Sequence, residues 1–342
     1  MLPMSVPWPH PGRSNQVSRH LLQRPRSVGD DLRWRLLNQW APDALDSYVG
    51  IFDILNQLLP VAPGDLKRSS MTRSGSPLLV SVDESAPQVL RFTVDAMSNA
   101  PGQLSGFIDW VAGILPESVG RFLKVLNDVP GEPIPCMYVG MRPTDAGVGV
   151  KLYLGRLPHS PDVINGILTR LVSGFGQLRD CGAKLAELVN DWQSISPGMY
   201  GLGVTVTDDG PVALDGYFLM PMGTDNFDGF RDVSNGCDLK LLELDVRSAG
   251  VEFKGSSFGT AISVDLKGHV HSFKLEFPVL GEFRLLPSMS MSSRLGSLLW
   301  SGRPPAPDVL SFRANGRKAF SPVAYYHIAG LTKSSTEKPP PA

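Results

Sequence analysis

The segment CMYVGMR-PTDAG-VGVKLYLG, residues Cys136 to Gly155, carries the clearest structural pattern in this chain. Two runs of alternating apolar and polar residues flank a turn rich in Pro, Asp and Gly, which is the pattern of a β-hairpin. Four more segments have this pattern, with turns near residues 85, 209, 267 and 315. Together with the turn near residue 145 they recur at steps of roughly 60, 64, 58 and 48 residues, which indicates an internal repeat.

Between the hairpins, apolar residues recur at three- and four-residue steps, which favours amphipathic helices. These segments are Asp31–Leu59, Leu104–Leu126, Val163–Val189, Cys237–Phe253 and Leu280–Leu299. Pro116 interrupts the second segment, and the third divides around Gly174 and Gly176. The repeating unit is therefore about two helices followed by a hairpin. Ten antiparallel strands of this kind predict an α+β fold, a closed β-barrel with helices outside, because closure removes exposed sheet edges.

The composition is that of a globular protein, with 42% hydrophobic and 19% charged residues among 342. A net charge of -1 argues against a general nucleic-acid binder. Three cysteines without a CxxC pair favour a reducing compartment, and no stretch is long and apolar enough to span a membrane. We expect a cytoplasmic monomer with a flexible arm at 1–29, a single barrel domain over 30–330 and a disordered tail at 331–342.

Alternation gives each strand an apolar and a polar face. In the run from Leu90 to Asp95, for example, Phe92 and Val94 share the apolar face with Leu90. The helices would cover these apolar faces, so the polar faces must line the barrel. Those polar faces carry Arg91, Lys151, Lys274 and Arg313. Since unpaired buried charge costs several kcal/mol per ion, the interior should hold water or an anion, with phosphate or diphosphate as the leading candidate.

Tyrosines accompany these charges. Six of the seven lie in hairpin segments: Tyr138, Tyr153, Tyr200, Tyr217, Tyr325 and Tyr326. One interpretation is that tyrosine simply favours strands. The other is that Tyr153 and Tyr217, each two residues after a charged position, shield a cation with the ring face and bond an anion with the hydroxyl.

With this repeat in place, the chain resembles the ABBA-type aromatic prenyltransferases, the PT barrels. The resemblance rests on the ααββ order beyond residue 30 and on short motifs in the hairpins. These motifs are LRFTV (Leu90–Val94), VKLYL (Val150–Leu154), LDGYF (Leu214–Phe218), FKLEFPV (Phe273–Val279) and VAYYHI (Val323–Ile328).

The resemblance implies transfer of a dimethylallyl or geranyl group from its diphosphate to an electron-rich aromatic acceptor of the indole or phenol type. Ionisation of the allylic C–O bond and Friedel–Crafts-like attack by the aromatic would follow, with cations stabilising the leaving diphosphate and apolar walls excluding water. Position by position, it implies diphosphate binding by Arg91, Lys151, Lys274, Tyr153, Tyr217 and Tyr325.

The sequence departs from the family at two places. One branch binds Mg²⁺ through an Asp at the position of Arg91, where a fixed positive charge would replace the metal, so we expect no cofactor and no metal requirement. Relatives often carry Asn or Lys where this chain has Asp215 and Ser321. Arg313 or Lys318 can compensate, and Arg313 completes the predicted diphosphate site.

The reaction also needs a proton acceptor. Glu276 is the best-placed carboxylate because it shares a strand face with Lys274, although it could equally be a simple ionic partner of that lysine. Asp95 and Asp215 are weaker candidates. Other chemistries lack their motifs: DDxxD, GxxxxGK[ST] and GxGxxG are missing, and His269 and His271 alone make no metal site.

Two alternatives keep the barrel but change the function. One is prenylation of a side chain in a ribosomal peptide, which needs an open barrel end. The other is a non-catalytic barrel that binds an anionic lipid or metabolite and retains it without turnover.

Overall fold

The computed structural model describes residues 27–37, 45–62, 64–69, 71, 75–83, 89–98, 106–128, 137–145, 147–155, 157, 160–192, 196, 198–221, 257–278, 308–314 and 321–328. The helices expected over 237–253 and 280–299, Lys318, and nearly all of the expected N-terminal arm and C-terminal tail lie outside these residues. The first described helix already begins at Val28. Among the described helices, none is long and apolar enough to cross a membrane.

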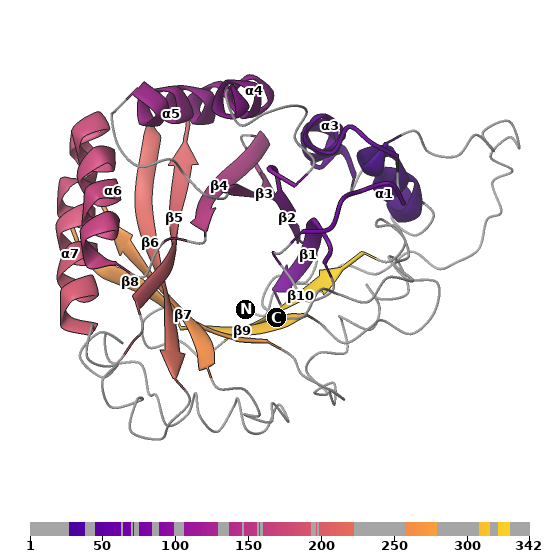
Figure 1. Ribbon diagram of the computed structural model, residues 1–342. Helices are drawn as coiled ribbons and strands as arrows, with labels where there is room; N and C mark the ends of the chain where they lie inside the picture. Colours follow the sequence, from indigo (N-terminus) through magenta and orange to yellow (C-terminus); the bar gives the residue numbers. More distant parts are fainter. Residues whose placement is uncertain are drawn as a thin grey trace, which may run out of the picture.

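A closed antiparallel barrel forms the centre of the described structure, in the order β1-β10-β9-β8-β7-β6-β5-β4-β3-β2 (Figure 1). The barrel closes where β1 pairs with β10, with Ser81 opposite Tyr325. The strands are β1 (Leu78–Asp83), β2 (Leu90–Asp95), β3 (Met137–Thr144), β4 (Gly147–Gly155), β5 (Gly198–Thr207), β6 (Gly210–Pro221), β7 (Ser257–Asp265), β8 (Val270–Pro278), β9 (Val309–Ala314) and β10 (Ser321–His327). The predicted fold class is confirmed.

The ten strands form the five predicted hairpins, β1–β2, β3–β4, β5–β6, β7–β8 and β9–β10. Turn chemistry explains why the chain reverses there. Gly210 and Gly268 have φ values of 109° and 75°, a backbone region that side chains other than glycine rarely adopt. The Asp265 carboxylate also accepts hydrogen bonds from the backbone N–H groups of Lys267 and His269, which holds the β7–β8 turn.

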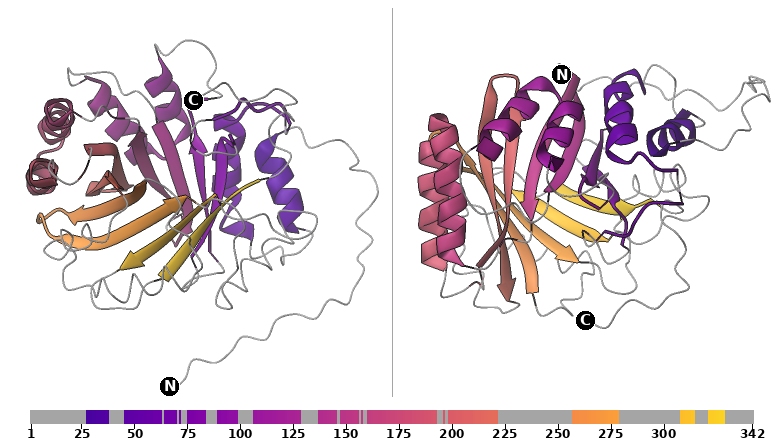
Figure 2. Two further views of the ribbon diagram at one scale, coloured as in Figure 1. Left: turned by 60° about the horizontal axis from the view of Figure 1, so that its bottom comes forward. Right: turned by 45° about the horizontal axis from the view of Figure 1, so that its top comes forward.

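The described helices lie on the outer surface of the barrel, as both views of Figure 2 show. They are α1 (Val28–Leu37), α3 (Val49–Leu58), α4 (Phe107–Ile114), α5 (Glu117–Asp128), α6 (Pro161–Gly174) and α7 (Arg179–Asp191), with a 3₁₀ turn at Gly176–Leu178. The expected interruption at Pro116 separates α4 from α5, and the one around Gly174 and Gly176 separates α6 from α7. Helix α3 packs on β3 and β4, α5 on β5 and β6, and α7 on β6 and β7.

The hydrophobic core lies between these helices and the barrel wall. Phe92 on β2 is fully buried, and its ring meets Phe52 of α3 edge-on at 6.3 Å. Phe218 on β6 is also buried and lies 4.8 Å from the ring of Trp192, at the end of α7. The apolar strand faces therefore point outward, as alternation predicts, and burial of this surface drives their packing against the helices. The opposite faces are left to line the interior.

Candidate functional site

The barrel encloses a cavity of about 890 Å³, a volume typical of sites for small organic ligands. It reaches the end of the barrel at which the hairpins turn, where Thr144 of β3 and Thr207 and Asp208 of the β5–β6 turn are exposed. Pro116, Ser118 and Val119 beside the start of α5 form part of its lining. The interior is therefore hollow, as the charged strand faces predict.

All seven residues predicted to bind diphosphate line this one cavity. They come from β2, β4, β6, β8, β9 and β10 and are Arg91, Lys151, Tyr153, Tyr217, Lys274, Arg313 and Tyr325. Glu276, the predicted proton acceptor, is not part of this lining. Glu276 lies two residues after Lys274 on β8 and is therefore farther from the β7–β8 turn. Ser321, the second departure from the family, lies opposite Arg313 in the β9–β10 register.

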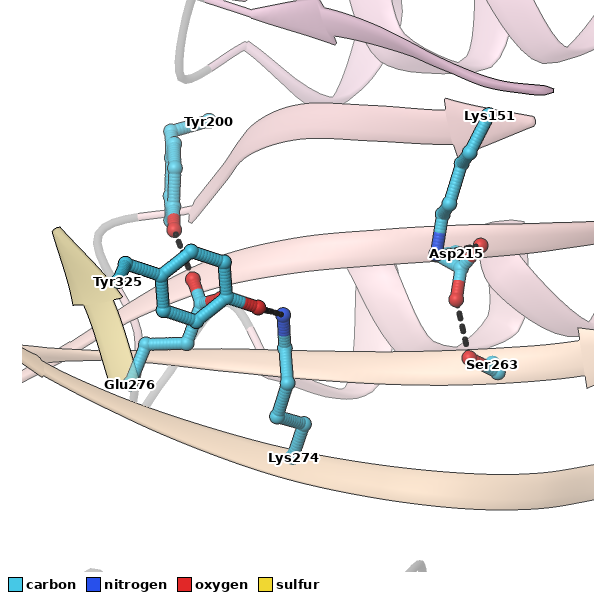
Figure 3. A network of polar contacts seen from close by, with 7 residues as sticks. All are labelled: Lys151, Tyr200, Asp215, Ser263, Lys274, Glu276 and Tyr325. Carbon is cyan, nitrogen blue, oxygen red and sulfur yellow. Dashed lines mark hydrogen bonds and ion pairs between the residues drawn. The ribbon is translucent and has the colours of Figure 1, made fainter. Parts of the chain in front are cut away.

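Lys151 on β4 forms an ion pair with Asp215 on β6, with a distance of 2.7 Å from Nζ to Oδ2. The hydroxyl of Ser263 on β7 donates a hydrogen bond to the other oxygen of the same carboxylate (Figure 3). Asp215 is only 3% exposed, so its charge needs both partners. Burial and the charges of Lys274 and Arg313 lower the pKa of Lys151, while Asp215 acts in the opposite direction.

A second ion pair joins Lys274 and Glu276, neighbours on the inner face of β8. The Lys274 ammonium also donates to the Tyr325 hydroxyl at 3.5 Å, and the Tyr200 hydroxyl donates to Glu276 at 3.4 Å (Figure 3). Burial opposes the charge on Lys274, but the Glu276 carboxylate and the neighbouring tyrosines outweigh it and raise the pKa of Lys274. This lysine is therefore a permanent cation in the wall of the cavity.

The tyrosine rings gather around the two ammonium groups. The ring centroid of Tyr217 lies 5.9 Å from Lys151 Nζ and 5.3 Å from Lys274 Nζ. Tyr153 meets Tyr217 edge-on at 5.8 Å, and its centroid lies 5.4 Å from Lys151 Nζ. Burial raises the pKa of both phenols, so they stay neutral and present π faces to positive charge. The structure thus favours the cation-shielding interpretation of these two residues over mere strand preference.

Glycines make room for these side chains. A Cβ at Gly140 would come within 2.8 Å of the Tyr153 ring, and one at Gly203 within 2.9 Å of Lys151 Cε. Ser263 and Arg142 also line the cavity but were not among the predicted residues. Arg142 could have been found from the alternation of β3, which places Tyr138, Gly140 and Arg142 on one face.

Within the described residues, no group of three or more His, Cys, Asp or Glu side chains is arranged to hold a metal ion. His271 lines the cavity, whereas His269 is exposed and its ring lies 3.7 Å from Asp265. The cavity wall instead carries charge on lysine and arginine, which can hold an anion directly.

The sequence matches no protein-family model and no curated protein. The fold, by contrast, is similar to solved structures. The prenyltransferase PriB in its apo form has a TM-score of 0.64 and 12% identity, over 89% of this chain and 97% of that one. The 5-dimethylallyl tryptophan synthase from Streptomyces coelicolor, in complex with DMASPP and Trp, has a TM-score of 0.64 and 15% identity, over 93% and 98%. AnaPT from Neosartorya fischeri has a TM-score of 0.59 and 11% identity, over 91% and 94%.

The chain has the PT-barrel fold. The similarity extends over nearly the whole length of each structure, so the resemblance found in the hairpin motifs is confirmed at the level of architecture. At identities of 11 to 15% it establishes the fold, and function has to be argued from the cavity of this PT barrel itself.

Proposed function

We propose that this protein is an aromatic prenyltransferase. The observation that carries the proposal is the convergence of four cations, Arg91, Lys151, Lys274 and Arg313, and of neutral tyrosine rings in one cavity of a PT barrel. A cationic wall fits a diphosphate, and π faces next to it fit an allylic carbocation. The donor is a dimethylallyl or geranyl diphosphate, and the acceptor is an electron-rich aromatic of the indole or phenol type.

The chemistry begins with heterolysis of the allylic C–O bond. The bonding electron pair leaves with the diphosphate oxygen, and lysine and arginine charges stabilise the negative charge that develops there. The positive charge remains on the allylic carbon, where the faces of Tyr153 and Tyr217 attract it. A π electron pair of the acceptor then forms the new C–C bond, and loss of a ring proton restores aromaticity. The cations already present supply the charge that a metal would otherwise provide, so the proposed reaction is metal-independent.

We propose that Glu276 is the group that accepts the ring proton. This carboxylate accepts a hydrogen bond from Tyr200 and pairs with Lys274, so Tyr200 or a water molecule would have to connect it to the cavity. The alternative is that Glu276 only serves as the counter-ion of Lys274. Glu276→Gln separates the two roles. If Glu276 is the proton acceptor, the variant has a lower kcat, whereas if Glu276 is only the counter-ion of Lys274, the variant mainly has a changed KM for the donor.

Two structures of this fold support the acceptor class: the Streptomyces coelicolor synthase in complex with DMASPP and Trp, and PriB in a ternary complex with L-tryptophan and dimethylallyl thiolodiphosphate. The test is incubation of the purified protein with dimethylallyl or geranyl diphosphate and a panel of indoles and phenols in EDTA. Mass spectrometry detects the prenylated product, and a diphosphate assay detects donor consumption. Consumption of neither donor with any acceptor would refute the proposal. Binding without turnover would favour the non-catalytic barrel, and turnover only with Mg²⁺ would refute metal independence.

A further inference from the structure

Arg142 is a fifth cation in the cavity wall, near the hairpin end of the barrel. It lies on the same face of β3 as Gly140, two residues closer to the turn. Its partner across the β3–β4 ladder is Gly149. A Cβ at Gly149 would lie 3.4 Å from Arg142 Cγ and 3.5 Å from Nε, so the arginine side chain runs directly over this glycine.

Arg142 also faces other positive charges. Strands β2 and β3 are neighbours in the barrel (Figure 1). In their ladder, Phe92 lies opposite Met141. The same register continued by one residue places Arg91 opposite Arg142. Like charges at directly opposed strand positions destabilise a sheet. Burial lowers the pKa of Arg142, and the charges of Arg91 and Arg313 lower it further, which places both arginines near it.

Arg142 differs from the two lysines of the cavity in its partners. Lys151 is paired with Asp215, and Lys274 is paired with Glu276. For Arg142, by contrast, no hydrogen bond or ion pair with any described residue is formed. Besides Asp215, the described carboxylates that line the cavity are Asp208 and Asp265, which lie in or beside the hairpin turns. The Arg142 guanidinium has no acidic partner among the described residues and lies near other positive charges. An anion with several oxygens would neutralise this excess positive charge.

We propose that Arg142 binds the diphosphate of the donor, across the cavity mouth from Arg313 and beside Arg91. This inference rests on the proposed function and deepens it. It assigns a binding residue that the hairpin motifs do not contain, and it places the diphosphate toward the hairpin end of the barrel. The planar fork of the guanidinium contacts two phosphate oxygens at once, which a lysine at this position could not do.

The test measures binding rather than turnover. Isothermal titration with dimethylallyl thiolodiphosphate and, separately, with inorganic pyrophosphate compares the wild type with Arg142→Gln. We expect affinity for both probes to fall by roughly 10- to 100-fold, the usual contribution of a charge-assisted hydrogen bond. Arg142→Lys should show an intermediate loss because it keeps the charge but not the fork. The matched control is Arg33→Gln, an exposed arginine on α1, which should bind as the wild type does.

Thermal stability distinguishes binding from a structural role. Removing one of several crowded like charges should leave the Tm of the ligand-free Arg142→Gln protein equal to that of the wild type or higher. A lower Tm together with weaker binding would overturn the inference, and so would unchanged affinity for both probes. If the wild type binds neither probe, the proposed function fails as well. If the wild type binds both and Arg142→Gln binds equally tightly, only the role of Arg142 fails.

Discussion

Lys151 and Asp215 form their ion pair over Gly203, the residue that lies between them on the intervening strand β5. Gly203 is the register partner of Asp215 on β6, and of Tyr153, two residues beyond Lys151, on β4. A Cβ there would lie 2.9 Å from Lys151 Cε and 3.1 Å from Asp215 Cβ. The pair therefore spans three strands because the middle one has no side chain.

Substitution of Gly203 should separate the pair. Gly203→Ala places a methyl group against both side chains, so we expect a loss of about 1–3 kcal/mol in the free energy of unfolding and a drop in prenyl transfer. Gly201→Ala is the matched control, since it lies on the same strand and a Cβ there has no neighbour nearer than 3.4 Å. Denaturant titration and steady-state kinetics measure the two effects. Equal stability and activity in the two variants would contradict the steric argument.

Asp215→Asn tests the electrostatic side of the same pair. The Asp215 carboxylate raises the pKa of Lys151 against burial and against Lys274 and Arg313. Its removal must lower the pKa of Lys151 further, so the lysine loses its proton at a lower pH than in the wild type. Pyrophosphate binding needs the charged lysine. The alkaline limb of the affinity profile should therefore lie at lower pH in Asp215→Asn than in the wild type.

The control for this experiment is Ser263→Ala, which removes one hydrogen bond to Asp215 but leaves the carboxylate in place. Its alkaline limb should lie close to that of the wild type. An Asp215→Asn profile that coincides with the wild-type profile, or moves to higher pH, would show that Asp215 does not support the charge on Lys151.

Lys151→Ala removes a cation next to the developing diphosphate charge. We expect kcat to fall by roughly 100-fold or more, as expected when a preorganised electrostatic partner of the leaving group is lost. Lys184→Ala on α7, whose lysine pairs with Glu187 on the outer surface, should leave kcat unchanged. A near-normal rate for Lys151→Ala would remove this lysine from the proposed site.

Tyr217 should act through its ring rather than its hydroxyl. Tyr217→Phe keeps a π face between the ammonium groups of Lys151 and Lys274, so kcat should stay within about tenfold of the wild type. Tyr217→Leu removes that face from the wall and should lower kcat by a further order of magnitude. Single-turnover kinetics with saturating donor measure both. Similar rates for the Phe and Leu variants would mean that the aromatic face plays no part.

Much of the site could be inferred before any coordinates because side chains alternate strictly along a strand. Once the hairpin turns marked the register of each strand, Arg91, Lys274 and Arg313 had to share the interior face. Helical spacing likewise separated the covering helices from the strands, and Pro116 marked a break between two of them. These inferences use only local geometry, within a dozen or so neighbouring residues.

The partners of these side chains depend on the closed barrel. Alternation along the chain specifies which residues face inward. It does not specify whether Glu276 reaches the cavity, which carboxylate neutralises Lys151, or whether Arg142 meets Arg91. Those relationships join strands far apart in the chain, and the stagger of one strand against the next sets the height of each side chain along the barrel axis. That stagger is established only in the folded barrel, because it results from closing all ten described strands at once.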